Sequence, residues 1–160
     1  DLSTDRAAQE AVLERGQYSL KIVRHLLSIA FDHLTIARAL FSLHRFEQAK
    51  EEFDQAVAGI RKAGKIEFMP VFLLERAQFL CHQKDFKQSQ VNLDEALEII
   101  TRCGMKFYAA DAALLQARLN LDQNKAAQNE YQKAKELIEL TGYHLRDKEL
   151  AELRKRLGEL

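Results

Sequence analysis

Two stretches of this chain repeat one another, and they decide the fold. The stretch ARALFSLHRFEQAKEEFDQAVAGIRKAG runs from Ala37 to Gly64, and the stretch AQFLCHQKDFKQSQVNLDEALEIITRCG runs from Ala77 to Gly104. They align without a gap, so that Ala37 matches Ala77 and Gly64 matches Gly104. Similarity at a fixed period of this length indicates a repeat architecture.

A third, shorter copy follows. Ala117 lies as far beyond Ala77 as Ala77 lies beyond Ala37, whereas the step from Ala96 to Ala134 is shorter by two. Two residues are therefore missing between Ala117 and Ala134. Because turns tolerate deletion better than packed helices do, we expect the loss to fall in the polar stretch 122–125.

Each copy reads as two helices. In the second helix of the first copy, apolar residues fall at steps of three and four and so form one helical face. Gly64, Gly104 and Gly142 close the three second helices, where a residue in the left-handed conformation is needed. The apolar face of the first copy consists of Phe46, Ala49, Phe53, Ala56, Val57 and Ile60.

The first helix of each pair is more apolar than the second and carries a small residue in its middle, namely Ala37, Ala77 or Ala117. Small residues at these places let the two helices of a pair approach closely. The ends of a repeat array must differ from its middle, because terminal repeats hide apolar faces from water. We therefore expect a leading helix and a C-terminal capping helix, the latter with an apolar stripe of Leu150, Leu153 and Leu157.

The composition supports an all-α fold and narrows the function. A single proline and six glycines are too few for the many turns of an all-β protein. Lys plus Arg equals Asp plus Glu, at 24 each, which gives no electrostatic reason to expect a nucleic-acid or membrane partner. No apolar run is long enough to span a bilayer and no secretory signal opens the sequence. Cys81 and Cys103 are too few for a disulfide framework, so we expect reduced thiols in a cytoplasmic protein.

The repeat resembles the tetratricopeptide (TPR) family. Its pattern W-x2-L-G-x2-Y followed by A-x3-F is matched loosely by His33-x2-Ile36-Ala37-x2-Leu40 and by Ala49-x3-Phe53, Ser89-x3-Leu93 and Ala127-x3-Tyr131. The resemblance implies a right-handed superhelix of helical hairpins, an α-α solenoid. The period is 40 and not the usual 34, and a period near 40 is also compatible with HEAT or armadillo repeats.

Three stretches carry a closer resemblance: residues 28–40, 93–105 and 141–153 look like the C-terminal TPR sensor regions of large bacterial signal-transduction NTPases. No phosphate-binding motif GxxxxGK[ST] occurs in the sequence, so the nucleotide-binding domain of such proteins is not part of it. The resemblance implies that this chain is the sensor segment of a larger bacterial signalling protein.

We therefore expect one array over residues 1–160, with three helix pairs between a leading and a capping helix. The expected segments are the leading helix at 1–26, the repeats at 27–65, 66–105 and 106–143, and the capping helix at 144–160.

In the TPR family the first helix of each pair lines the concave groove, and the residue after the small one faces that groove. Here these residues are Arg38, Gln78 and Arg118. An arginine there could clamp a carboxylate with two hydrogen bonds, as in a peptide with acidic groups or a free C-terminus, or it could pair with acids of the array itself. The remaining candidate groove residues are Leu34, Phe41, Leu74, His82, Asp111 and Leu114.

We find no catalytic constellation. Cys81 and His82 are neighbours in the sequence, but consecutive helical side chains point about 100° apart and cannot act as a pair through that adjacency. The five histidines show no metal-binding spacing, and we expect neither a metal nor a cofactor. His33, in the place of the consensus tryptophan, is expected to pack between helices. The expected function is that of a non-enzymatic scaffold that binds a protein or peptide, and the alternative is a module for homo-oligomerisation, such as a homodimer.

Overall fold

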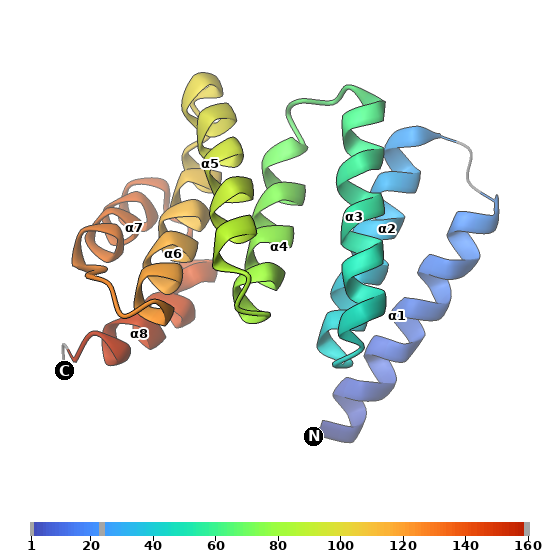
Figure 1. Cartoon of the computed structure of the whole chain (residues 1–160), viewed down its shortest axis with the longest axis horizontal. Coiled ribbons are helices and arrows are strands. Elements are labelled where there is room, and N and C mark those ends of the chain that lie inside the picture. Colours follow the sequence, from blue (N-terminus) through green and yellow to red (C-terminus); the bar gives the residue numbers. More distant parts are fainter. Residues whose placement is uncertain (1, 23–24, 159–160) are drawn as a thin grey trace. The chain divides into compact units, whose positions relative to one another are not determined.

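The computed structural model describes residues 2–22 and 25–158, and these ranges are helical without a strand (Figure 1). The predicted all-α fold is confirmed. In the described ranges one helix comes first, three pairs follow and a short helix comes last, as the repeat pattern predicts. The elements are α1 (Leu2–Ile22), α2 (Leu26–Ser42), α3 (Phe46–Ala63), α4 (Met69–His82), α5 (Phe86–Cys103), α6 (Lys106–Asp122), α7 (Gln128–Thr141), η1 (His144–Arg146) and α8 (Asp147–Arg156).

The glycines that end the second helices have the expected conformation. Gly64, Gly104 and Gly142 have φ values of 67°, 66° and 68°, in the left-handed region. Glycine adopts this region without steric cost, and from it the chain closes the last turn of α3, α5 and α7. These ends of the helices are therefore confirmed as the sequence predicts them.

The turn inside each helix pair recurs with the same geometry. His44, Lys84 and Asn124 have positive φ values of 59°, 62° and 56°, and they are separated by the full repeat period. The amide that follows each of them donates to the carbonyl five residues earlier, as Arg45 does to Leu40 over 2.9 Å. The repeat is therefore visible in backbone hydrogen bonds as well as in side chains.

This recurrence corrects the expected place of the two-residue loss. The full period holds up to Asn124, so the turn itself is intact. The loss falls between Lys125, which still keeps the full period, and Ala127, which matches Ser89 at the shorter offset, just before the second helix. As a result α7 begins only at Gln128 and has 14 residues, whereas α3 and α5 each have 18. In the third pair the second helix is shorter by one helical turn, whereas the hydrogen-bonded loop at Asn124 is preserved.

The chain divides into two compact units, Asp1–Phe72 and Leu73–Leu160. In the first unit α2 packs against α1 and α3. A Cβ at Gly16 of α1 would lie 2.6 Å from the side chain of Ile36, so a larger residue there would force Ile36 or α1 to shift. Phe31 of α2 meets the rings of Phe68 and Phe72 edge to face, at centroid distances of 5.5 and 5.0 Å.

In the second unit α6 packs against α5, α7 and α8. Gln116 of α6 and Gln90 of α5 exchange two amide hydrogen bonds of 2.8 and 3.0 Å. The predicted stripe of the last helix is confirmed, because Leu153 is buried and Leu150 and Leu157 pack against the same core. The other buried members of that core are Ala110, Ala113, Leu114, Ala117, Ala127, Tyr131, Ala134 and Ile138.

The small residues have the expected role. Ala37, Ala77 and Ala117 have no exposed surface. In the second pair the hydroxyl of Ser89 donates to the carbonyl oxygen of Ala77 over 2.7 Å, which joins α5 to α4. Among the described helices, none is both long enough and apolar enough to cross a membrane.

Candidate functional site

The expected groove residues of the first unit lie on α2. Arg38 is exposed, Phe41 is half-buried and Leu34 is buried. Phe41 faces the ring of Phe46, at a centroid distance of 6.2 Å. Leu34 therefore serves the packing of this unit and has almost no surface to offer a partner.

The expected groove residues of the second unit lie on α4 and α6. Gln78 and His82 are exposed, whereas Leu74 and Leu114 are buried and contribute to packing. Cys81, next to His82, is buried, so the two neighbours point to different surroundings, as helical geometry predicts. Because Arg38 belongs to one unit and Gln78 to the other, a continuous binding row stays a prediction.

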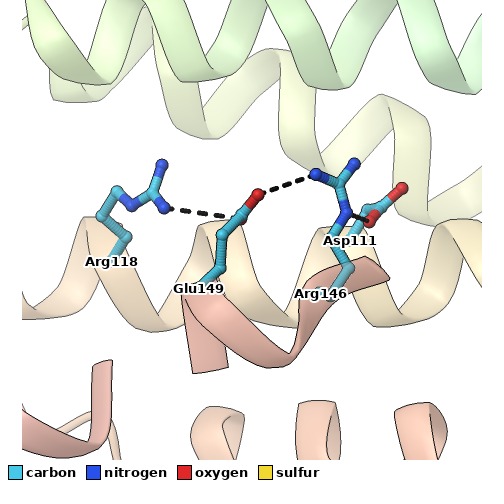
Figure 2. Close-up of polar contacts among 4 residues, drawn as sticks. All are labelled: Asp111, Arg118, Arg146 and Glu149. Carbon is cyan, nitrogen blue, oxygen red and sulfur yellow. Dashed lines mark hydrogen bonds and ion pairs between the residues drawn. The ribbon is translucent and has the colours of Figure 1, made fainter. Parts of the chain in front are cut away.

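Two residues of the expected groove, Asp111 and Arg118 of α6, join a chain of ionic contacts with the C-terminal segment (Figure 2). The Nε of Arg146 donates to Oδ1 of Asp111 over 2.7 Å, and its Nη1 donates to Glu149 over 2.7 Å. The other carboxylate oxygen of Glu149 lies 3.5 Å from Nη2 of Arg118. We call these four residues, Asp111, Arg146, Glu149 and Arg118, the ionic row.

Burial affects the pKa values of Asp111 and Arg146, the most closely paired residues of the ionic row, in different ways. Loss of solvation raises the pKa of the Asp111 carboxyl above its usual range, and this outweighs the opposite effect of the bound Arg146. For Arg146, burial alone would lower the pKa of the guanidinium, but the carboxylates of Asp111 and Glu149 raise it. Arg146 therefore stays charged, and Asp111 is a carboxylate in surroundings that favour its neutral form.

A second contact joins the far end of α6 to α8. The guanidinium of Arg156 donates to Oδ1 of Asp122 over 2.5 Å, and the Cys81 thiol lies 3.5 Å from the other oxygen of Asp122. Burial and this carboxylate raise the pKa of Cys81 to about 11. The thiol is therefore protonated at neutral pH and is a poor nucleophile.

An open pocket lies beside the ionic row. It has a volume of about 710 Å³, within the usual range of small-ligand pockets of about 300–1,000 Å³. The rings of Phe107 and Tyr143 meet edge to face in it, with centroids 5.4 Å apart and planes at 85°. We call it the aromatic pocket, and it is lined by Gly104, Met105, Lys106, Phe107, Tyr108, Asp111, Thr141 and Tyr143.

Local sequence explains how the pocket forms. Gly104 and Gly142 each turn the chain at the end of a helix, and each is followed closely by aromatic residues of the pocket. After Gly104 the amide of Met105 bonds back to Ile100 over 3.0 Å; after Gly142 the amide of Tyr143 bonds back to Ile138 over 3.2 Å. These bonds fix where α6 begins and where Tyr143 stands.

Exposure and charge set the character of the pocket. Phe107 is 55% exposed, so its ring presents apolar surface to solvent at the pocket. The guanidinium carbon of Arg146 lies 5.6 Å from the ring centroid of Tyr143, within the range of a cation–π contact. Burial, with the charge of Asp111 as a lesser cause, raises the pKa of the Tyr108 hydroxyl, so it remains a neutral donor.

Outside this pocket the candidate chemistry is sparse. His33 of α2 is half-buried and its Nδ1 lies 2.6 Å from Glu52 of α3, so it joins two helices as the sequence predicts. No group of three or more His, Cys, Asp or Glu side chains placed to hold a metal ion occurs in the residues that the structure describes.

Sequence reasoning placed Asp111 at the margin of a groove but missed Phe107, Tyr143 and Arg146. The available signal was the position of the two aromatic residues just after helix-ending glycines. Comparison of this chain with known protein families, with curated proteins and with solved structures gives no match. The site therefore rests on its own geometry.

Proposed function

We propose that this chain is a protein-binding scaffold of helical hairpins, and that its second unit holds a segment of a partner protein in the aromatic pocket. The observation that carries the proposal is the exposed ring of Phe107 at an open, largely apolar pocket. Large exposed apolar groups with a few polar neighbours are typical of interaction sites. Aromatic residues also contribute much of the binding energy at protein interfaces.

The architecture belongs to the same proposal. We propose that the three hairpins form a TPR-like right-handed superhelix, supported by the turn that recurs at His44, Lys84 and Asn124. On that basis the chain would act as the sensor or partner-binding segment of a larger bacterial signalling protein. This last step rests on the resemblance of residues 28–40, 93–105 and 141–153 alone.

Recognition of an acidic partner by Arg38 and Arg118 is a separate proposal. In this chain Glu149 occupies the position that an acidic side chain of a partner would take at Arg118. Such a partner would therefore have to compete with Glu149. A ligand of the aromatic pocket would not have to displace Glu149 from Arg118, and for this reason we place the main site in that pocket.

A peptide-display selection on the whole chain tests the main proposal. Selected peptides should bind Phe107→Ala at least about fivefold more weakly, because loss of a central aromatic contact costs more than about 1 kcal/mol. Val91→Ala on α5 is the matched control, since Val91 is apolar and 53% exposed but does not line the pocket. Equal affinity of the wild-type protein and Phe107→Ala would rule out this site.

The alternative function, homo-oligomerisation, gives a different result. Light scattering over a range of concentrations should show a monomer if the pocket serves a different protein. A dimer at all concentrations that Phe107→Ala converts to a monomer would assign the pocket to self-association.

A further inference from the structure

We propose that the aromatic pocket binds an organic ammonium group, such as a quaternary amine or a methylated lysine side chain, against its aromatic lining and near Asp111. The inference rests on the proposed function, because it names the chemical class of the group that enters the same pocket. Three features carry it: the aromatic lining of the pocket, the carboxylate of Asp111 in its wall, and the guanidinium of Arg146, which already contacts that carboxylate and the ring of Tyr143 beside the pocket.

The lining of the pocket is rich in aromatic side chains, and two of its rings meet edge to face. Phe107 and Tyr143 stand at 85° with centroids 5.4 Å apart, and Tyr108 adds a third aromatic side chain to the lining. The face of an aromatic ring carries partial negative charge and attracts a cation that lies over it. Groups of such rings are the usual binding site of quaternary ammonium ions and methylated lysine.

Asp111 provides the negative charge. Its side chain is only 16% exposed. One oxygen accepts from Arg146, and the other points away from that arginine (Figure 2). No hydrogen bond to this second oxygen occurs among the residues that the structure describes. A carboxylate with little solvent and a vacant oxygen is stabilised by a further positive charge.

The contacts of Arg146 show that a cation can bind between Asp111 and Tyr143. Its guanidinium bonds to Asp111 and lies 5.6 Å from the ring centroid of Tyr143. A cation is therefore already held by one ring and one carboxylate of the same cluster. The remaining pocket, at about 710 Å³, has room for a second, bulkier cation beside Phe107.

The positive charge of Lys106 should repel an ammonium ligand, and changing that charge therefore tests the inference. It is exposed at the rim of the pocket and carries a positive charge. For an ammonium ligand, Lys106→Glu should strengthen binding. For a ligand that carries a carboxylate, the same change should weaken it. The sign of this one effect separates the two classes of ligand.

The test compares two probes of nearly the same shape on the whole chain. Choline carries a trimethylammonium group, and 3,3-dimethylbutan-1-ol carries a neutral tert-butyl group in its place. Titration followed by NMR of backbone amides should show choline bound at least about threefold more tightly, with shifts at residues 104–108. Asp111→Asn should remove this preference, Lys106→Glu should increase it, and Glu139→Gln, an exposed acid of α7 outside the pocket, should leave it unchanged.

Three results would overturn the inference: equal binding of the two probes by the wild-type protein, no binding of choline, or an unchanged preference in Asp111→Asn. The comparison of probes uses the unaltered protein, so a variant that fails to fold does not affect it. If both probes bind equally and peptides still depend on Phe107, the ammonium inference fails while the proposed function stands. If peptides do not depend on Phe107, the proposed function fails.

Discussion

Helix α6 meets its two later neighbours through different chemistry. Towards α7 it presents Ala113 and Ala117, which lie in one buried cluster with Ala134 and Ile138. Towards the C-terminal segment it presents Asp111, Arg118 and Asp122, which pair with charged side chains. The α7 side repeats what the earlier hairpins do, whereas the charged side occurs where the array meets its last helix. Apolar packing therefore builds the repeat, and the last helix adds these ion pairs to the burial of its Leu153 in the same cluster.

The largest effect should come from the apolar side. Ile138→Ala removes a fully buried side chain from the cluster between α6 and α7 and should lower the free energy of unfolding by about 2–4 kcal/mol. Urea unfolding followed by circular dichroism measures it. Ile66→Ala, at an apolar residue that is 44% exposed, is the control and should change little. If Ile138→Ala lowered the free energy of unfolding less than Arg146→Gln does, apolar packing would not be the stronger of the two kinds of contact.

Arg146→Gln tests the centre of the ionic row. It leaves Asp111 and Glu149 without their shared cation in half-buried surroundings, and we expect a loss of about 1–3 kcal/mol. Arg154→Gln removes the same charge from an exposed position of α8 and should stay within about 0.5 kcal/mol of wild type. Equal effects of the two changes in urea unfolding would mean that the ionic row does not hold α8.

A smaller effect should appear as a dependence on pH. The pKa of Asp111 is raised in the folded protein, so folding favours its protonated form. Its stabilising contribution is present below the ordinary pKa of 3.8 and is lost as the pH rises through the folded-state value. The stability of wild type minus that of Asp111→Asn should therefore fall as the pH rises from 3.8 and then level off. A difference that grows with pH would show that Arg146 outweighs burial.

The smallest effect should come from the end of the ionic row. Arg118 and Glu149 lie 3.5 Å apart with a quarter to a third of each side chain exposed. Pairs of this kind contribute about 0–1 kcal/mol. A double-mutant cycle of Arg118→Gln and Glu149→Gln should give a coupling energy in that range. A coupling energy above that range would make Arg118 a main anchor of α8 and a poor candidate for binding a partner.

The fold could be predicted where local pattern decides it. Gly64, Gly104 and Gly142 end their helices because the left-handed conformation is a property of glycine itself. The buried Leu153 follows from a stripe of leucines at helical spacing. The two-residue loss was misplaced, because a hydrogen-bonded turn is not recognisable from polarity alone. In the structure the turn at Asn124 is kept, and the loss shortens α7.

The candidate site was harder to predict because it depends on distant residues. Asp111 and Arg146 are 35 residues apart in the chain, and nothing in the spacing of either residue specifies the other. Their contact depends on the way η1 and α8 return to α6. The same return places Tyr143 against Phe107. For Arg118 the sequence left two alternatives open, a carboxylate of a partner or an acid of the array, and in the structure Arg118 lies 3.5 Å from Glu149.

The turn that recurs at His44, Lys84 and Asn124 has a consequence for engineering. Its hydrogen bonds are the same at His44 and at Lys84, so residues 45–84 begin and end at equivalent points of the backbone. This segment is a cassette: a second copy inserted after Lys84 would enter and leave through a turn that the chain already forms at each hairpin. The same equivalence marks the site at which a natural duplication could have lengthened the protein without any new kind of junction.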